Sequence, residues 1–253
     1  MTDKRLAMDR DLASKRSAAY SLLAYALAYP ENSALESLRE AAGEATTALA
    51  GTPLAGLARI AATATRAELE PAYVRLCTLS SSPDCPTYES AYFSSDPQQQ
   101  TNRMADIAGF YRAFGVESAD TGFRPDDMPV ELEFMAFLCR KQAYAALHLG
   151  APRAGQTLRA QRTFLADHLG CWAGGLGRRF AAGAPVGHFY QMAGLALAEW
   201  VADDCHLLGA RPEEVSGQPM QALGPETSHG PEFEGPGSPI FSFDEIPVAE
   251  VSR

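Results

Sequence analysis

An acid and an imidazole that are neighbours in the chain, Asp167 and His168 in the run FLADHLGCW, are the polar pair best suited to chemistry. Such a pair can hold a metal ion that activates water for hydrolysis. Metal-dependent phosphohydrolysis is therefore one interpretation. It would need outer ligands from His148 and from Asp203 or Asp204. The Asp-then-His order is the reverse of the one that His-Asp sites use.

The same pair also has a purely local interpretation. Neighbouring residues on a helix point about 100° apart. His168 follows Phe164 at four-residue spacing, which predicts a partly buried ring. Asp167 could then cap a helix that begins near Gly170. A third possibility is that both side chains contact a ligand in a groove.

The second unusual stretch is PTYESAY, residues 86–92. Its aromatic residues, with Phe93 after them, could face a bound peptide while Glu89 receives a cation. Alternatively, the loop is held together by its own aromatics, with Thr87 as an N-cap and Glu89 in the first turn of a short helix. Local chemistry leaves both interpretations open.

Enzyme motifs are absent from the sequence. It contains no phosphate-binding GxxxxGK[ST] loop, no GxGxxG after a strand, no HExxH and no GxSxG. We therefore predict no catalytic residues, no cofactor and no activity as an enzyme.

Helical patterning dominates the elements that must position these residues. Ala18, Leu22, Tyr25 and Tyr29 share one helical face, and the helix ends at Pro30. The remaining helices are predicted at residues 33–48, 54–79, 98–114, 128–148, 152–168, 169–182 and 188–209, with an interruption near Pro71 and a kink near Gly170.

The helix at 128–148 is apolar on several sides, which predicts a central position. Residues 80–97 read as a loop with at most a short helix. No segment has the pattern of a strand. The sequence therefore predicts an all-α fold, a single bundle of about eight to ten helices over residues 1–210.

Composition narrows the classes of function. The chain has 253 residues, 46% of them apolar, and a net charge of −10. Such acidity argues against nucleic acid as a partner but would attract a positively charged peptide. Its five cysteines include no CxxC pair, so we predict reduced thiols and no metal site. We expect no signal peptide, because the N-terminal run MTDKRLAMDRDLASKR is highly charged. No apolar run reaches the roughly 20 residues that span a bilayer, so we expect no membrane insertion and a cytoplasmic location.

Residues 211–253 differ from the rest. They hold seven prolines, five glycines and eight acidic residues against two basic ones, a net charge of −6. This composition predicts a disordered tail, because it cannot bury a core. An apolar patch within it could fold back on the body or touch a partner: Ile240, Phe241, Phe243, Ile246 and Val248.

Four motifs in a fixed order connect these observations. They are LEPAYVRLCTLSSSPDCPTYESAY (69–92), MADIAGFYRAFGV (104–116), PDDMPVELEFMAFL (125–138) and FLADHLGCW (164–172). In order and spacing the chain resembles the TorD/DmsD/NarJ-like redox-enzyme maturation chaperones, which serve trimethylamine-oxide, dimethyl-sulfoxide and nitrate reductases. The resemblance covers about residues 18–208.

The resemblance implies an all-α protein without catalysis, which binds the catalytic subunit of a molybdopterin oxidoreductase of the DMSO-reductase family. Many members bind that subunit's N-terminal twin-arginine leader and delay export until the cofactor is inserted. The peptide-binding positions that it implies here are Tyr73, Leu76 and Cys77, then Pro86, Tyr88, Glu89 and Ser90, and finally Asp167 and His168. Cys77 stands where relatives have Phe, and Thr87 separates Pro86 from Tyr88.

Side-chain chemistry is compatible with this site. Glu89 and Asp167 could pair with the guanidinium groups of the leader. Tyr73, Leu76 and Tyr88 could pack its apolar part. A helical regulatory or scaffold protein unrelated to export remains an alternative interpretation, beside the metal-dependent hydrolase.

Overall fold

The fold is all-α, as predicted. The structure is a computed structural model that describes residues 3–77, 85–116, 124–215 and 217–220. Its helices are α1 (Asp3–Leu27), α2 (Asn32–Ala48), α3 (Pro53–Ala61), α4 (Arg66–Cys77), α5 (Ser90–Phe93), α6 (Pro97–Ala113), α7 (Met128–His148), α8 (Ala151–Phe164), α9 (Gly170–Gly183) and α10 (Phe189–Leu208). A π-helical segment, η1 (Leu165–Leu169), joins α8 to α9. Among the described residues the only β-type pairing is an isolated bridge between Tyr88 and Asp127.

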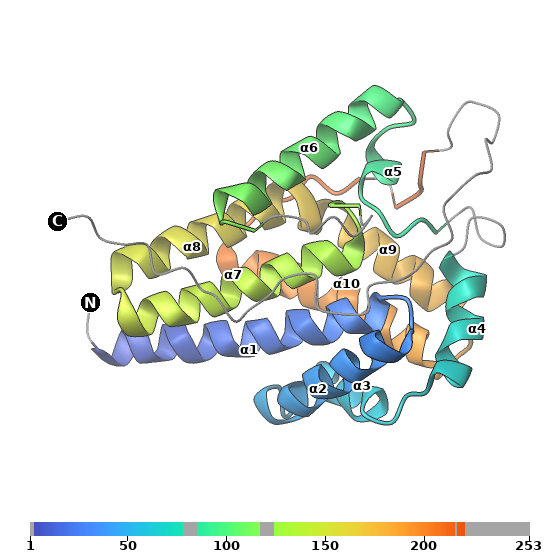
Figure 1. The fold of residues 1–253 in the computed structure, drawn as a ribbon, viewed down its shortest axis with the longest axis horizontal. Helices are drawn as coiled ribbons and strands as arrows, with labels where there is room; N and C mark the ends of the chain where they lie inside the picture. Colours follow the sequence, from blue (N-terminus) through green and yellow to red (C-terminus); the bar gives the residue numbers. More distant parts are fainter. Residues whose placement is uncertain (1–2, 78–84, 117–123, 216, 221–253) are drawn as a thin grey trace.

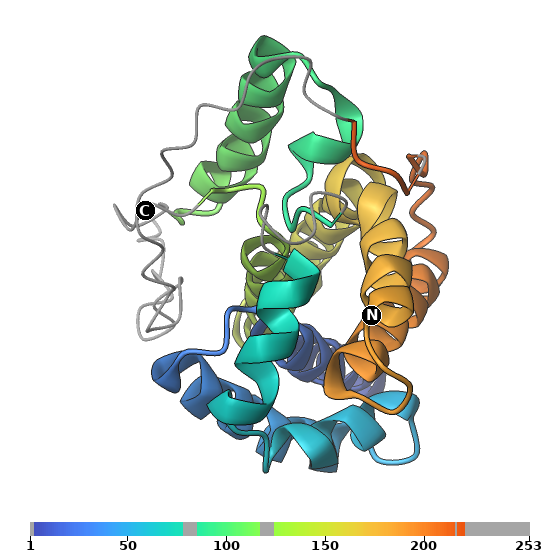
Figure 2. The same ribbon diagram turned by 90° about the vertical axis from the view of Figure 1, so that its right-hand side faces the viewer.

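Helix α7 is the centre of the bundle. It is buried on nearly all sides and packs along α1 and against α8 (Figure 1). On the other side of α1 lie α2 and α3, and α9 pairs with α10. Figure 2 places α5 and α6 at the end of the molecule opposite α2 and α3. The predicted central position of residues 128–148 is thus confirmed.

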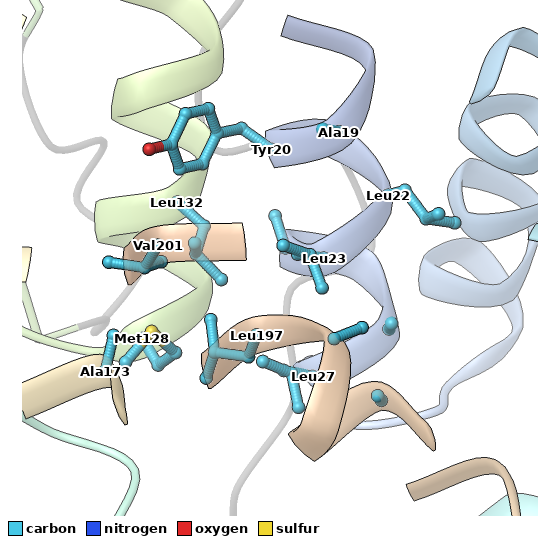
Figure 3. Close-up of a cluster of buried hydrophobic side chains, with 14 of the residues drawn as sticks. Ala19, Tyr20, Leu22, Leu23, Leu27, Met128, Leu132, Ala173, Leu197 and Val201 are labelled. Atoms are coloured by element: carbon cyan, nitrogen blue, oxygen red, sulfur yellow. The ribbon is translucent and has the colours of Figure 1, made fainter. Parts of the chain in front are cut away.

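The core is a layer of aliphatic side chains between α1, α7 and α10. Figure 3 shows Leu23 and Leu27 of α1 beside Leu132 of α7 and Leu197 of α10. All four are fully buried. Burial of such a side chain stabilises the fold by about 1.5–3 kcal/mol, so this layer accounts for much of the drive to form the bundle.

Two helix boundaries differ from the sequence-based prediction. Helix α1 begins at Asp3, because the charged run before Ala18 continues the same helix. Pro71 lies inside α4, and the break comes earlier, around Thr65, between α3 and α4. Pro71 is the sixth residue of α4, so its missing N–H removes the hydrogen bond that this position would donate to the Ala67 carbonyl.

A buried ion pair ties the start of the chain to the last helix. Arg16 of α1 donates from Nε to Asp204 Oδ1 (2.6 Å) and from Nη2 to Oδ2 (2.7 Å). The hydroxyl of Tyr20 donates to the same carboxylate, and Gln161 of α8 accepts from Arg16. Both charged side chains are almost fully buried. The pair therefore fixes how α1, α8 and α10 meet.

The first residues of the predicted tail lie against the helices. The Val215 N–H donates to the Cys171 carbonyl (3.0 Å), and the Met220 N–H donates to the Ala91 carbonyl (2.8 Å). A Cβ on Gly175 would lie 2.9 Å from the Gly217 Cα, so glycine permits this close approach. The domain boundary at residue 211 stays a prediction. Residues 221–253, with the apolar patch at 240–248, lie outside the described residues.

Substitution of Gly177 should separate α9 from α10. A Cβ at this position would lie 2.5 Å from the Gly194 carbonyl oxygen, which is backbone and cannot rotate away. We expect Gly177→Ala to lower the free energy of unfolding by about 1–3 kcal/mol in urea titrations, the usual cost of overpacking. The control is Gly43→Ala, on the exposed face of α2. A Cβ at this position would meet nothing within 4 Å, so the substitution should raise stability by up to about 1 kcal/mol. Equal effects at both positions would contradict this account.

Removal of the Asp204 carboxylate should leave the buried Arg16 guanidinium without its ionic partner. We expect Asp204→Ala to lower the free energy of unfolding by about 3–5 kcal/mol, the range for breaking a buried ion pair. The neighbouring Asp203 is exposed, and Asp203→Ala should stay within about 0.5 kcal/mol of wild type. Chemical denaturation of both variants, side by side, measures the difference.

Candidate functional site

The loop that carries Pro86 to Ser90 is docked on the start of α7. The Glu89 N–H donates to the Asp126 carbonyl (2.8 Å), and the Met128 N–H donates to the Thr87 carbonyl (2.8 Å). The Tyr92 hydroxyl donates to the Pro86 carbonyl (2.9 Å) and holds the loop from inside. Two motifs that are separate in the sequence, at 86–92 and 125–138, therefore form one structural unit. Thr87 caps no helix, in contrast to the second interpretation of this loop.

Glu89 is fully buried beneath this unit and bears two internal partners. Arg103 of α6 donates to Glu89 Oε1 from Nε (3.0 Å), and His168 Nδ1 lies 3.3 Å from Oε2. Arg103 also donates to the Asp167 backbone carbonyl, and its guanidinium lies 3.8 Å above the Phe93 ring. The predicted residues Glu89, Asp167 and His168 thus do come together, but around an arginine of the chain itself.

The π-helical segment turns Asp167 and His168 in opposite directions. His168 is fully buried between Phe110 and Phe164, each with a ring-centroid distance of 5.3 Å. Asp167 is exposed, and its carboxylate makes no hydrogen bond or ion pair with any described residue. A Cβ on Gly170 would lie 2.3 Å from the Leu165 carbonyl oxygen, so the segment needs glycine there. This π-helical segment stands where a kink was predicted near Gly170. Asp167 does not cap α9.

Tyr88 and Ser90 contact a second internal arginine. The guanidinium of Arg124 lies 4.0 Å above the Tyr88 ring and donates to Ser90 Oγ (2.8 Å). It also donates to both carboxylate oxygens of Asp126, at 3.0 and 3.1 Å. Asp126 is fully buried and accepts a further hydrogen bond from the Ser90 N–H (3.1 Å). Sequence reasoning missed Arg103, Arg124 and Asp126, and the only signal for Asp126 was its place in the 125–138 motif.

A second buried carboxyl group lies beside Glu89. Glu131 Oε2 accepts from the Trp172 indole N–H (3.3 Å). Burial, and then the charge of Glu89, raise the pKa of Glu131 well above its ordinary value. The neutral form of Glu131 is therefore favoured beside the ion pair of Glu89 and Arg103.

The apolar part of the predicted site belongs to the core. Tyr73 packs edge-on against Tyr29 and Tyr190, with ring centroids 5.5 and 5.8 Å apart. Leu76 is buried against the end of α9, where a Cβ on Gly183 would lie 2.6 Å from it. Cys77 is half-buried, and burial raises its pKa well above the ordinary value. In this conformation these side chains fill the interior instead of lining an open groove.

The ligands proposed for a metal-dependent hydrolase are dispersed. Asp204 is paired with Arg16, while His148 stacks on Tyr144 at the far end of α7 (ring centroids 4.5 Å apart). In the ranges that the structure describes, no three His, Cys, Asp or Glu side chains are arranged to hold a metal ion. None of the described helices is long and apolar enough to cross a membrane.

Comparison with known proteins settles the family. The family profile described as "Nitrate reductase delta subunit" matches residues 26–177, a range that contains all four motifs. The chain belongs to this family. The predicted relationship to the TorD/DmsD/NarJ-like chaperones is confirmed.

One curated relative adds detail. The chain is 41% identical over 91 residues to a perchlorate reductase assembly chaperone protein from Dechloromonas aromatica (strain RCB). The match covers 34% of this chain and 40% of the relative, so it extends over less than half of either protein.

Asp127, which caps α7 within the 125–138 motif, should make stability depend on pH. Burial raises its pKa to about 6, although hydrogen bonds from Thr87 and the Met128 N–H oppose the shift. Because the folded state takes up this proton more readily than the unfolded chain, stability is lost as pH rises from the ordinary pKa value of 3.8 to about 6 and changes little above that. Asn keeps a capping acceptor but does not titrate.

We therefore expect Asp127→Asn to gain stability relative to wild type as pH rises from 4 to 7. The gain should be on the order of 1–2 kcal/mol, less than the full shift implies because the side chain is partly accessible. Urea titrations at half-unit pH steps measure it. A stability difference that is the same at every pH would show that Asp127 does not titrate in this range.

Proposed function

We propose that this protein is an assembly chaperone for the catalytic subunit of a molybdopterin oxidoreductase of the DMSO-reductase family. It binds the subunit in the cytoplasm, at its N-terminal twin-arginine leader, and holds it until cofactor insertion and assembly are complete. The observation that carries this proposal is the family match over residues 26–177, which includes every motif residue of the site. The named function of the perchlorate reductase relative supports it.

Exposed carboxylates at η1 and α6 supply the surface that a leader arginine can reach. Asp167 is exposed, and the hydrogen bond from Arg103 to its backbone carbonyl fixes its position. Asp106 of α6 is 69% exposed, and its Oδ2 lies 3.5 Å from His168 Nε2. The exposed carboxylates of Asp106, beside the imidazole, and of Asp167 make this rim acidic. Guanidinium groups pair with such carboxylates through charge-assisted hydrogen bonds.

Glu89 takes a different role from the one predicted. Its carboxylate is fully buried and already paired with Arg103 and His168, so it holds the rim in place and does not meet the leader. Asp167 is the contact residue, and Glu89 is a positioning residue.

Calorimetry with a synthetic leader peptide that contains two adjacent arginines tests the proposal. We expect Asp167→Ala to weaken binding about five- to tenfold, or about 1 kcal/mol, without a change in melting temperature. The matched control Asp203→Ala, an exposed acid on α10, should bind like wild type.

Glu89→Gln should weaken binding indirectly, by destabilising the fold. It removes the charge that compensates Arg103, so we expect a lower melting temperature together with weaker binding.

Wild-type affinity in Asp167→Ala would contradict the proposed contact. Failure to recover the cofactor-free catalytic subunit in a pull-down with the wild type would contradict the chaperone itself.

A further inference from the structure

Two arginines of the chain lie on the predicted peptide-binding residues: Arg103 on Glu89, and Arg124 on Tyr88 and Ser90. Arg103 binds Glu89 and the Asp167 carbonyl and stacks on Phe93. In the same way, Arg124 binds Asp126 and Ser90 and stacks on Tyr88. Each of these two arginine sites offers a carboxylate, a neutral oxygen and an aromatic face. That combination is how proteins recognise a guanidinium group in particular.

The site that Arg103 occupies is a fixed part of the fold. Its carboxylate, Glu89, is fully buried, and only 23% of the Arg103 side chain is exposed. Arg103 joins α6 to α5 and η1, so its withdrawal would separate three elements. It would also leave a buried charge with His168 as its sole remaining partner in the described chain. An incoming arginine would therefore have to overcome a large cost here.

Arg124 is held much more locally. Its side chain is 39% exposed, and its ionic partner Asp126 is only two residues away in the chain. Asp126 is also fixed by the Ser90 N–H, and Ser90 is fixed by the short helix α5. The carboxylate, the hydroxyl and the Tyr88 ring are therefore positioned by the loop and by α7, without help from Arg124.

We propose that Tyr88, Ser90 and Asp126 form a guanidinium subsite, which Arg124 fills in the unliganded protein and which one arginine of the bound leader takes over. The identity of the ligand rests on the proposed function. The subsite is connected to the Asp167 rim through Glu89, which lies between Tyr88 and Ser90 in the chain and contacts Arg103. Two neighbouring arginines of one peptide thus have two acceptor sites.

Occupation by Arg124 has two consequences. It lowers the apparent affinity, because only the fraction of molecules with a vacated subsite can bind. It also makes the subsite selective, since the flat fork of a guanidinium matches Asp126 and the Tyr88 ring, whereas a lysine ammonium reproduces neither arrangement. Arg124 therefore acts as an internal competitor that only another arginine replaces well.

Removal of the competitor should strengthen binding. The probes are the peptide with two adjacent arginines and the same peptide with two lysines, measured by calorimetry. We expect Arg124→Ala to bind the arginine peptide about tenfold more tightly than wild type, a factor that equals about 1.4 kcal/mol. Affinity for the lysine peptide should rise much less, because an ammonium cannot reproduce the two-point contact of a guanidinium with Asp126. Arg159→Ala, an exposed arginine on α8, is the matched control and should bind both peptides like wild type.

A purely structural Arg124 would behave differently. Arg124→Ala would then bind the arginine peptide no better than wild type, or would gain equally with both peptides, and either outcome overturns the proposal. If Arg124→Ala does not fold, Arg124→Gln takes its place. Adding Tyr88→Leu to the variant should abolish the gain, because the aromatic face is lost.

A small probe separates failure of the subsite from failure of the proposed function. N-acetyl-arginine amide should raise the melting temperature of Arg124→Ala but not that of Arg159→Ala. If this occurs while no variant binds the leader peptide, the subsite stands and its assignment to a leader is wrong. If neither the amide nor the peptide acts on Arg124→Ala selectively, the subsite itself is refuted.

Discussion

One buried carboxylate, Glu89, organises the end of the bundle where the motifs meet. An ionised carboxyl group in a protein interior is very costly unless it is paired and hydrogen-bonded. Arg103 from α6 and His168 from η1 satisfy this requirement, and so α5, α6 and η1 have to converge. Burial and the neighbouring charge of Glu89 raise the pKa of Glu131, which accepts a hydrogen bond from Trp172. The cluster thus pairs one buried carboxylate with one guanidinium, and the imidazole lies between two rings.

The π-helical segment follows from the same requirement. His168 has to point inward to reach Glu89, while the helix continues from α8 into α9 without interruption. Insertions of this kind are rare and occur mostly at functional positions. Here the segment fixes a buried imidazole, and the neighbouring Asp167 then projects into solvent. The adjacent acid and imidazole, which suggested a metal site, serve as a presented carboxylate and its anchor.

Sequence patterns predicted the elements well because helical periodicity and proline positions are local signals. The central place of α7 could be read from apolar residues on all its sides. Long-range charge pairing carries no such signal. Arg16 lies in a charged run and would be taken for a surface residue, yet its partner Asp204 is 188 positions away in the chain. Glu89 was likewise identified as important, but nothing in its neighbourhood showed that Arg103 neutralises it. The close approach of Gly217 to Gly175 on α9 could not be read from the sequence, where Gly217 only contributed to the glycine content of the tail.

Internal pairing changes what a partner must supply. An unpaired carboxylate binds any cation, so an open acidic groove would hold lysine-rich and arginine-rich segments almost alike. Here each carboxylate already has an arginine and an aromatic ring as partners. The binding free energy of an incoming cation is therefore only the difference between its contacts and those that it replaces. Selectivity then comes from the match to a guanidinium, and affinity stays moderate. Under the proposed function, which requires release of the client after assembly, moderate affinity with high selectivity is an advantage, because Arg124 would reoccupy Asp126 when the leader departs.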